Sequence, residues 1–150
     1  LLFSMLAPLH IGIDVGSTTV KLVCFEENRL VFKKYERHLS DVNSTIDRIF
    51  CEASPILKDR KLVVAVTGSG GQRIAALLNL PYVQEVVACG AAIDTFLPTT
   101  DVAIELGGED AKVSWFKDGI QTASRMNAVC SGGTGSFLYS MANLLNTHTL

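Results

Sequence analysis

The sequence lacks a C-x-x-C pair of cysteines. The four cysteines are Cys24, Cys51, Cys89 and Cys130. Their wide spacing favours neither a zinc site nor a disulfide framework, so a reducing cytoplasm is the expected location. Cys24 falls in a strand pattern, and Cys51 and Cys89 fall in helical patterns. We therefore expect these three to be small buried hydrophobic residues.

Charge and long apolar runs are also limited. Charged residues make up 19% of the chain and the net charge is −2, so no basic field favours nucleic acid. The apolar opening, LLFSMLAPL, contains Pro8 and is far shorter than the ~20 residues that cross a bilayer. We expect no nucleic-acid or membrane partner, and we interpret residues 1–9 as a leader or a remnant. Because the sequence starts without methionine and stops after a helical pattern, we expect it to be a fragment of a longer protein.

The first motif that the sequence does contain is a glycine turn between two alternating runs. Residues 11–14 and 20–25 alternate in hydrophobicity around Gly-Ser-Thr-Thr, which predicts a strand, a turn and a strand. Backbone N–H groups and hydroxyls at such a strand end suit an anionic phosphate, and Asp14 beside them could hold a cation through water. An ordinary hairpin with Gly16 at a positive φ would look the same. The candidate phosphate-binding residues are Gly16, Ser17, Thr18 and Thr19, with Lys21 as a counter-charge.

The same arrangement occurs again in residues 101–115, DVAIELGGEDAKVSW. Glu105 stands in the register of Asp14, and Gly107, Gly108 and then Lys112 follow it. Two such units facing each other could hold a polyphosphate and its metal from both sides. This repeated pattern resembles the actin, sugar kinase and chaperone ATPase superfamily.

The remaining pattern predicts an α/β, ribonuclease-H-like (actin-like ATPase) fold with a mixed sheet flanked by helices. Strands are expected at 29–35, 61–67, 82–86, 101–106, 111–116 and 120–125, with 61–67 central and 82–86 at an edge. Helices are expected from Ser40 as N-cap to Pro55, and at 72–80, 87–96 and 134–145. Residues 10–100 would form one complete half and residues 101–150 the start of a second, with the boundary near 98–101.

A third motif, MNAVCSGGTGSF, covers residues 126–137. Its glycines, including Gly133 and Gly135, would leave the start of the following helix open to an anion. The same setting lowers a thiol pKa, so a Cys130 thiolate could ligate an iron–sulfur cluster. A buried thiol beside a glycine-rich helix cap is the alternative.

Together the three motifs, IGIDVGSTTVK, IELGGEDAK and MNAVCSGGTGSF, resemble the ATP-dependent activators of 2-hydroxyacyl-CoA dehydratases, grouped with benzoyl-CoA reductase ATPase subunits. The resemblance covers residues 10–150 and implies an ATP-driven homodimer. It also implies one 4Fe-4S cluster between the two subunits, with two cysteine ligands from each. This cluster would pass single electrons from a donor such as ferredoxin or flavodoxin to the dehydratase. Cys130 matches the first ligand, and the second would lie beyond Leu150. The sequence has Glu105 where the family more commonly has Asp, and Glu109 where it more commonly has Gln. In these two departures it resembles a long multidomain branch of the family.

The resemblance also implies roles for the phosphate-site residues. The first glycine turn would donate to the β- and γ-phosphates from one side, and Gly107 and Gly108 would approach from the other. Asp14 and Glu105 would hold the water shell of Mg²⁺. Glu109 would orient or deprotonate the attacking water. Glu109 and the neighbouring Asp110 could instead be solvated loop carboxylates, and we expect Lys21 and Lys112 to be charges on the strand faces rather than catalytic groups.

Two other classes of function remain open from the sequence. A sugar kinase of the same superfamily would need a general base near residues 67–72, where TGSGGQ offers no carboxylate. A non-catalytic nucleotide-binding module is the second alternative. We also expect the isolated chain to be inactive as an ATPase, because half of the nucleotide cleft would be absent.

Overall fold

The computed structural model describes residues 7–127 and 134–147. The chain forms two compact units, the first ending at Glu85 and the second beginning at Val86. The predicted site residues Cys130 and Gly133 lie outside the described residues. Within the described part, no helix is both long and apolar enough to cross a membrane.

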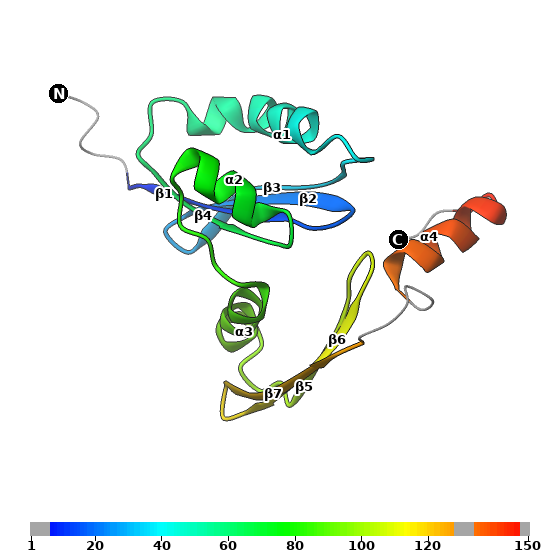
Figure 1. Cartoon of the computed structure of the whole chain (residues 1–150). Coiled ribbons are helices and arrows are strands. Elements are labelled where there is room, and N and C mark those ends of the chain that lie inside the picture. The colour runs from blue at the N-terminus through cyan, green and yellow to red at the C-terminus, as the bar shows by residue number, and fades with distance from the viewer. Residues whose placement is uncertain (1–6, 128–133, 148–150) are drawn as a thin grey trace. The chain divides into compact units, whose positions relative to one another are not determined.

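The first unit is built on a four-stranded mixed sheet (Figure 1). Its strands are β1 (Leu9–Val15), β2 (Thr19–Glu26), β3 (Arg29–Arg37) and β4 (Leu62–Thr67), in the spatial order β3-β2-β1-β4. β1 pairs antiparallel with β2 and parallel with β4. The first hairpin therefore forms as its alternating pattern predicts, and it occupies the centre of the sheet.

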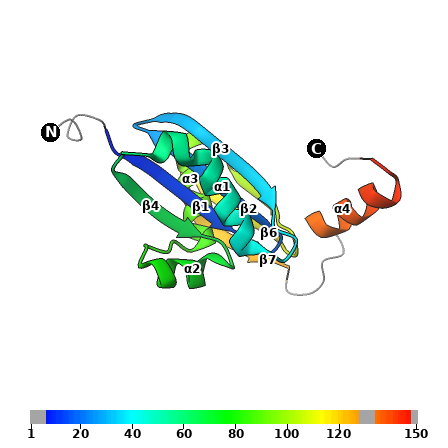
Figure 2. The ribbon, with the colours of Figure 1, turned by 90° about the horizontal axis from the view of Figure 1, so that it is seen from above.

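Two helices, α1 (Val42–Leu57) and α2 (Gly71–Leu78), cover one face of this sheet, as the side view and the view from above both show (Figures 1 and 2). The alternation of β1 turns Ile13 and Val15 into the core with Ile49 of α1 and Ala75 of α2. All four are buried, and a fully buried aliphatic side chain of this size contributes roughly 1.5–3 kcal/mol. The intervening residue of β1, Asp14, is thereby turned to the opposite face.

Both predicted ends of α1 are wrong. Asp41, and not Ser40, is the N-cap, and its carboxylate accepts the Ser44 N–H. Ser40 adopts φ 68°, a left-handed backbone rather than a cap conformation. Pro55 lies inside the helix because the carbonyl that its missing N–H leaves free, that of Cys51, accepts the Ser54 hydroxyl at 2.8 Å.

Three further predictions need correction. Tyr82 makes a single parallel bridge to Val66 instead of opening an edge strand over 82–86. β4 is the last strand of its sheet rather than a central one. Cys24 is buried as predicted, whereas Cys51 is exposed and Cys89 is only partly buried.

The second unit contains α3 (Glu85–Phe96), β5 (Val102–Leu106), β6 (Ala111–Lys117), β7 (Ile120–Met126) and α4 (Gly135–Leu144). Its strands form an antiparallel meander in the order β5-β6-β7. The second predicted hairpin is therefore β5-β6. The boundary between halves near residues 98–101 stays a prediction.

Candidate functional site

The first hairpin places an acid and a lysine directly opposite each other. Asp14 on β1 is the register partner of Lys21 on β2, and the Lys21 Nζ lies 2.6 Å from Asp14 Oδ2. Both side chains remain about one-third exposed, so a ligand could reach them. Tyr35 on β3 lies under the ammonium, with its ring centroid 5.6 Å from Nζ. Lys21 is thus held at the mouth of the glycine turn.

Gly16, the first turn residue, is not required by the fold. Among the described residues the only glycines with positive φ are Gly68 and Gly119, so the hairpin with a left-handed Gly16 is not what forms. A Cβ on Gly16 would lie 3.6 Å from the Thr19 carbonyl oxygen, 3.8 Å from Thr19 Oγ1 and 4.0 Å from Lys21 Nζ, all ordinary contacts. The missing side chain leaves a space flanked by a hydroxyl and an ammonium, and this space fits an anionic oxygen.

The end of β4 and the loop that follows it add two residues beside Asp14, Thr67 and Gly68, to which the sequence analysis gave no role in this site. Gly68 has φ +94°, and a Cβ there would collide with the Val15 carbonyl oxygen and stand 2.5 Å from Asp14 Oδ1. Thr67 pairs with Asp14 across the parallel strands. Its hydroxyl is buried without a hydrogen-bond partner in the described structure. A carboxylate beside an unsatisfied hydroxyl is a donor set of the kind that Mg²⁺ takes, together with phosphate and water.

His38 is a further residue that the sequence left unassigned. The side chain is buried, and Nδ1 accepts the Ser40 N–H at 3.1 Å. The proton of neutral His38 therefore lies on Nε2, which donates to the Gly16 carbonyl at 3.3 Å. The His38 N–H also donates to the Thr18 carbonyl at 3.2 Å. His38 thus fixes the first glycine turn to the end of β3.

The second hairpin repeats the pairing of the first. Glu105 on β5 is the register partner of Lys112 on β6, and their charged groups are 2.8 Å apart. The Lys112 side chain is 11% exposed and that of Glu105 45%, so the lysine is the more deeply held partner. Burial, and next the Glu105 carboxylate, raise the pKa of the nearby Cys89 thiol. The thiolate form of Cys89 is therefore disfavoured at this site.

The glycine turn of the second hairpin is bonded to the start of α4. The Gly107 and Gly108 carbonyls accept the N–H groups of Gly135 at 2.8 Å and Ser136 at 3.0 Å, and the Thr134 hydroxyl donates to Gly108 at 3.0 Å. The sequence pattern predicted a helix start that is open to an anion, but these two amides already donate to the Gly107 and Gly108 carbonyls. Gly135 is required here, because a Cβ would lie 2.9 Å from the Gly107 oxygen.

Each unit therefore assembles part of the predicted site by itself. The first groups Asp14, Gly16 and Lys21. The second groups Glu105, Gly107, Gly108 and Lys112. The Asp110 backbone carbonyl closes the second turn by accepting the Gly107 N–H at 2.8 Å. The Glu109 side chain is exposed. In the described ranges, no three His, Cys, Asp or Glu side chains are grouped to hold a metal ion alone.

Comparison with known proteins gives the context of these hairpins. The (R)-2-hydroxyglutaryl-CoA dehydratase activating ATPase of Acidaminococcus fermentans is 29% identical over 139 residues, which are 90% of this chain and 53% of that protein. The crystal structure of component A of the same organism's dehydratase superposes with a TM-score of 0.78 at 26% identity, covering 95% of this chain and 56% of that one. The chain thus spans about half the length of these relatives.

A second solved structure is the activator of 2-hydroxyisocaproyl-CoA dehydratase from Clostridium difficile with bound ADPNP. It matches with a TM-score of 0.74 at 25% identity, over 93% of this chain and 53% of that one. A protein of Bacteroides thetaiotaomicron with an actin-like ATPase fold also superposes, with a TM-score of 0.54, and the expected actin-like fold with a mixed sheet flanked by helices is thereby confirmed. The family model of the BadF/BadG/BcrA/BcrD ATPases matches residues 11–149. On this match over nearly its whole length, the chain belongs to the BadF/BadG/BcrA/BcrD ATPase family.

Proposed function

We propose that this chain is the part of a dehydratase activator that binds Mg-ATP through both of its glycine-turn hairpins. The observation that carries the proposal is the repeated cross-strand ion pair, Asp14 with Lys21 and Glu105 with Lys112, each beside a glycine turn. A cross-strand pair of opposite charges by itself stabilises a hairpin by roughly 0.2–1 kcal/mol, so the proposal rests on the recurrence of the pair beside a glycine turn in both hairpins. A common ligand, a polyphosphate with its cation, gives both pairs a use.

In the proposed nucleotide complex, the hydroxyls of the first turn and the Lys21 ammonium would bind phosphate oxygens over Gly16, whose own N–H already donates to the Thr19 carbonyl at 2.9 Å. Asp14 and Glu105 would hold the cation, and the Thr67 hydroxyl would supply a further oxygen on the side of Asp14. The magnesium would neutralise charge on the β- and γ-phosphates. Glu109, exposed next to the second glycine pair, orients the attacking water or accepts its proton. Most of the catalytic effect is positioning and electrostatic stabilisation.

The remaining part of the proposal concerns electron transfer in the whole protein. Cys130 would provide one ligand of a 4Fe-4S cluster shared between two subunits. A donor such as ferredoxin or flavodoxin would reduce it, and a 2-hydroxyacyl-CoA dehydratase would receive the electron. The relatives named above support the partner class. The bonds from Gly107 and Gly108 to the start of α4 support a coupling, because α4 follows Cys130 closely in the chain.

The test is a calorimetric titration of Mg-ADPNP into the whole protein that carries this chain. Asp14→Asn and Glu105→Gln should each weaken binding at least tenfold, about 1.4 kcal/mol, because each removes one charge that holds the cation. Asp47→Asn is the matched control, since Asp47 is an exposed carboxylate of α1. Wild-type affinity in both hairpin variants would disprove the proposal. Phosphate release without any added sugar acceptor separates an ATPase from a sugar kinase.

A further inference from the structure

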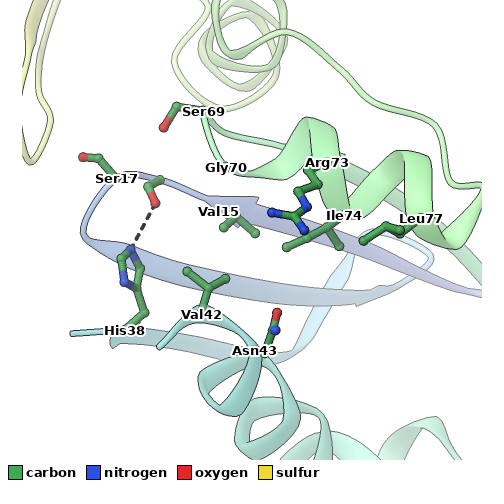
Figure 3. A pocket seen from close by; sticks show the side chains of 11 residues that line it. Val15, Ser17, His38, Val42, Asn43, Ser69, Gly70, Arg73, Ile74 and Leu77 are labelled. Atoms are coloured by element: carbon green, nitrogen blue, oxygen red, sulfur yellow. Dashed lines mark hydrogen bonds between the residues drawn. The ribbon is translucent and has the colours of Figure 1, made fainter. Parts of the chain in front are cut away.

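The first unit contains a cavity of about 480 Å³ between α1 and α2. Val15 lies at its floor, and Val42 of α1 and Ile74 of α2 line its sides (Figure 3). Val15 and Asp14 are consecutive residues of β1 and point to opposite faces of the sheet. The cavity therefore opens on the face opposite to the Asp14–Lys21 pair, and neither of these two side chains lines it.

The polar groups of this cavity include one charge and no carboxylate. Arg73 extends from α2 toward Val15, and Asn43 stands on α1 across from it (Figure 3). Arg73 makes no hydrogen bond or ion pair to the described residues, whereas the arginines Arg29, Arg48 and Arg60 of the same unit each pair with a glutamate. An unpaired guanidinium next to an apolar floor is suited to bind a carboxylate or phosphate group.

We propose that this cavity is a binding site for a small amphipathic anion. The anionic head would bind Arg73, and a short apolar body would lie against Val15, Val42 and Ile74. The volume of the cavity falls within the range of small-molecule sites. Its lining is also typical of such sites, because it is mostly apolar with a few converging polar groups. Leu77, which is 74% exposed at the edge of the cavity, would be covered by the same apolar body.

The cavity shares a wall with the first glycine turn. Gly16, Ser17 and His38 line it, and His38 holds the Gly16 carbonyl through Nε2 (Figure 3). A ligand in the cavity therefore contacts Gly16 and Ser17 of the turn, and also His38, which holds the turn in place. Its occupancy changes nucleotide affinity, and nucleotide changes the affinity of the cavity by the same factor. This coupling rests on the proposed function, but binding in the cavity does not.

The first experiment measures binding to the whole protein that carries this chain, without nucleotide, by chemical-shift titration. The probes are hexanoate, hexyl phosphate, inorganic phosphate and the uncharged hexanamide. Hexanoate, hexyl phosphate or both should bind and shift the resonances of α1 and α2, and hexanamide should bind at least tenfold more weakly. Binding by only one of the two organic anions identifies the head group as carboxylate or phosphate. Inorganic phosphate should bind more weakly than either, because it lacks the apolar body.

Two variants remove the site without touching the core. Arg73→Met removes the charge at an exposed position of α2, and Leu77→Asp places a negative charge at the exposed edge. Both should abolish binding of the organic anions, while Lys33→Met, at an exposed position of β3, should not. The proposal is overturned if no organic anion binds, if hexanamide binds equally well, or if both variants bind like the wild type.

The second experiment titrates Mg-ADPNP into the whole protein with and without saturating hexanoate or hexyl phosphate, whichever binds more tightly. A change in nucleotide affinity supports the coupling, and an unchanged affinity overturns the coupling. Because the first experiment contains no nucleotide, failure of the cavity proposal and failure of the nucleotide proposal give different results.

Discussion

For two glycines near the first hairpin, Gly16 and Gly68, substitution by alanine should affect different properties of the protein. Gly68 is required by the fold, because its φ is +94° and a Cβ would collide with the Val15 carbonyl and crowd the Asp14 carboxylate. Gly16 has no positive φ and would find only contacts of 3.6 Å or longer. We therefore expect Gly68→Ala to lower stability, and Gly16→Ala to lower nucleotide affinity at nearly unchanged stability.

The size of the stability effect follows from these contacts. A left-handed backbone costs a residue with a Cβ about 1–2 kcal/mol, and forcing a methyl group against packed oxygens adds roughly 1–3 kcal/mol. Gly68→Ala should therefore lose about 2–5 kcal/mol. The first unit ends at Glu85. In a domain of fewer than about 100 residues, each kcal/mol of lost stability lowers Tm by about 4–8 °C, so we expect a decrease of roughly 10 °C or more. Gly16→Ala should change the free energy of unfolding by less than about 1 kcal/mol.

Thermal unfolding followed by circular dichroism, and calorimetric titration of Mg-ADPNP, measure the two effects separately. Gly16→Ala should retain Tm but weaken nucleotide binding, because its methyl group occupies the space beside Lys21 Nζ. If Gly16→Ala binds ADPNP like the wild type, that space is not a phosphate site. If Gly68→Ala unfolds at the wild-type temperature, the loop does not make the close approach that the structure shows.

Three further predictions concern the other motifs. Cys130→Ala in the whole protein should retain nucleotide affinity but lose its iron and its brown colour after anaerobic purification, and unchanged iron content would remove Cys130 from the cluster. Gly135→Ala should loosen α4 from the second turn and speed amide hydrogen exchange there, since its Cβ would crowd the Gly107 oxygen; exchange at the wild-type rate would contradict this contact. Hydrogen bonds from Ser44 lower the pKa of Asp41, so its contribution to stability is present above an unfolded pKa of ~3.9 and is lost as pH falls through the lower folded value. Asp41→Asn should therefore keep the free energy of unfolding at pH 7 and should lose less of it than the wild type below about pH 4, as measured by acid unfolding curves. An acid transition as steep as in the wild type would exclude this role.

The α1 helix shows how far local pattern determines the fold. Its apolar stripe requires a helix that packs on a sheet, and the structure has one over Val42–Leu57. Its ends depend on individual hydrogen bonds instead. Ser54 satisfies the carbonyl that Pro55 leaves free, and His38 takes the Ser40 N–H, so the start moves to Asp41. A periodic pattern contains neither bond.

The two hairpins are the part of the candidate site that the sequence by itself determined. Alternation and a glycine turn set the register, and the register places Asp14 opposite Lys21 and Glu105 opposite Lys112. Only the tertiary structure brought Thr67, Gly68 and His38 to the first turn and the start of α4 to the second. These contacts join segments that are distant in sequence. They depend on which strands become neighbours and on single hydrogen bonds, and local periodicity records neither.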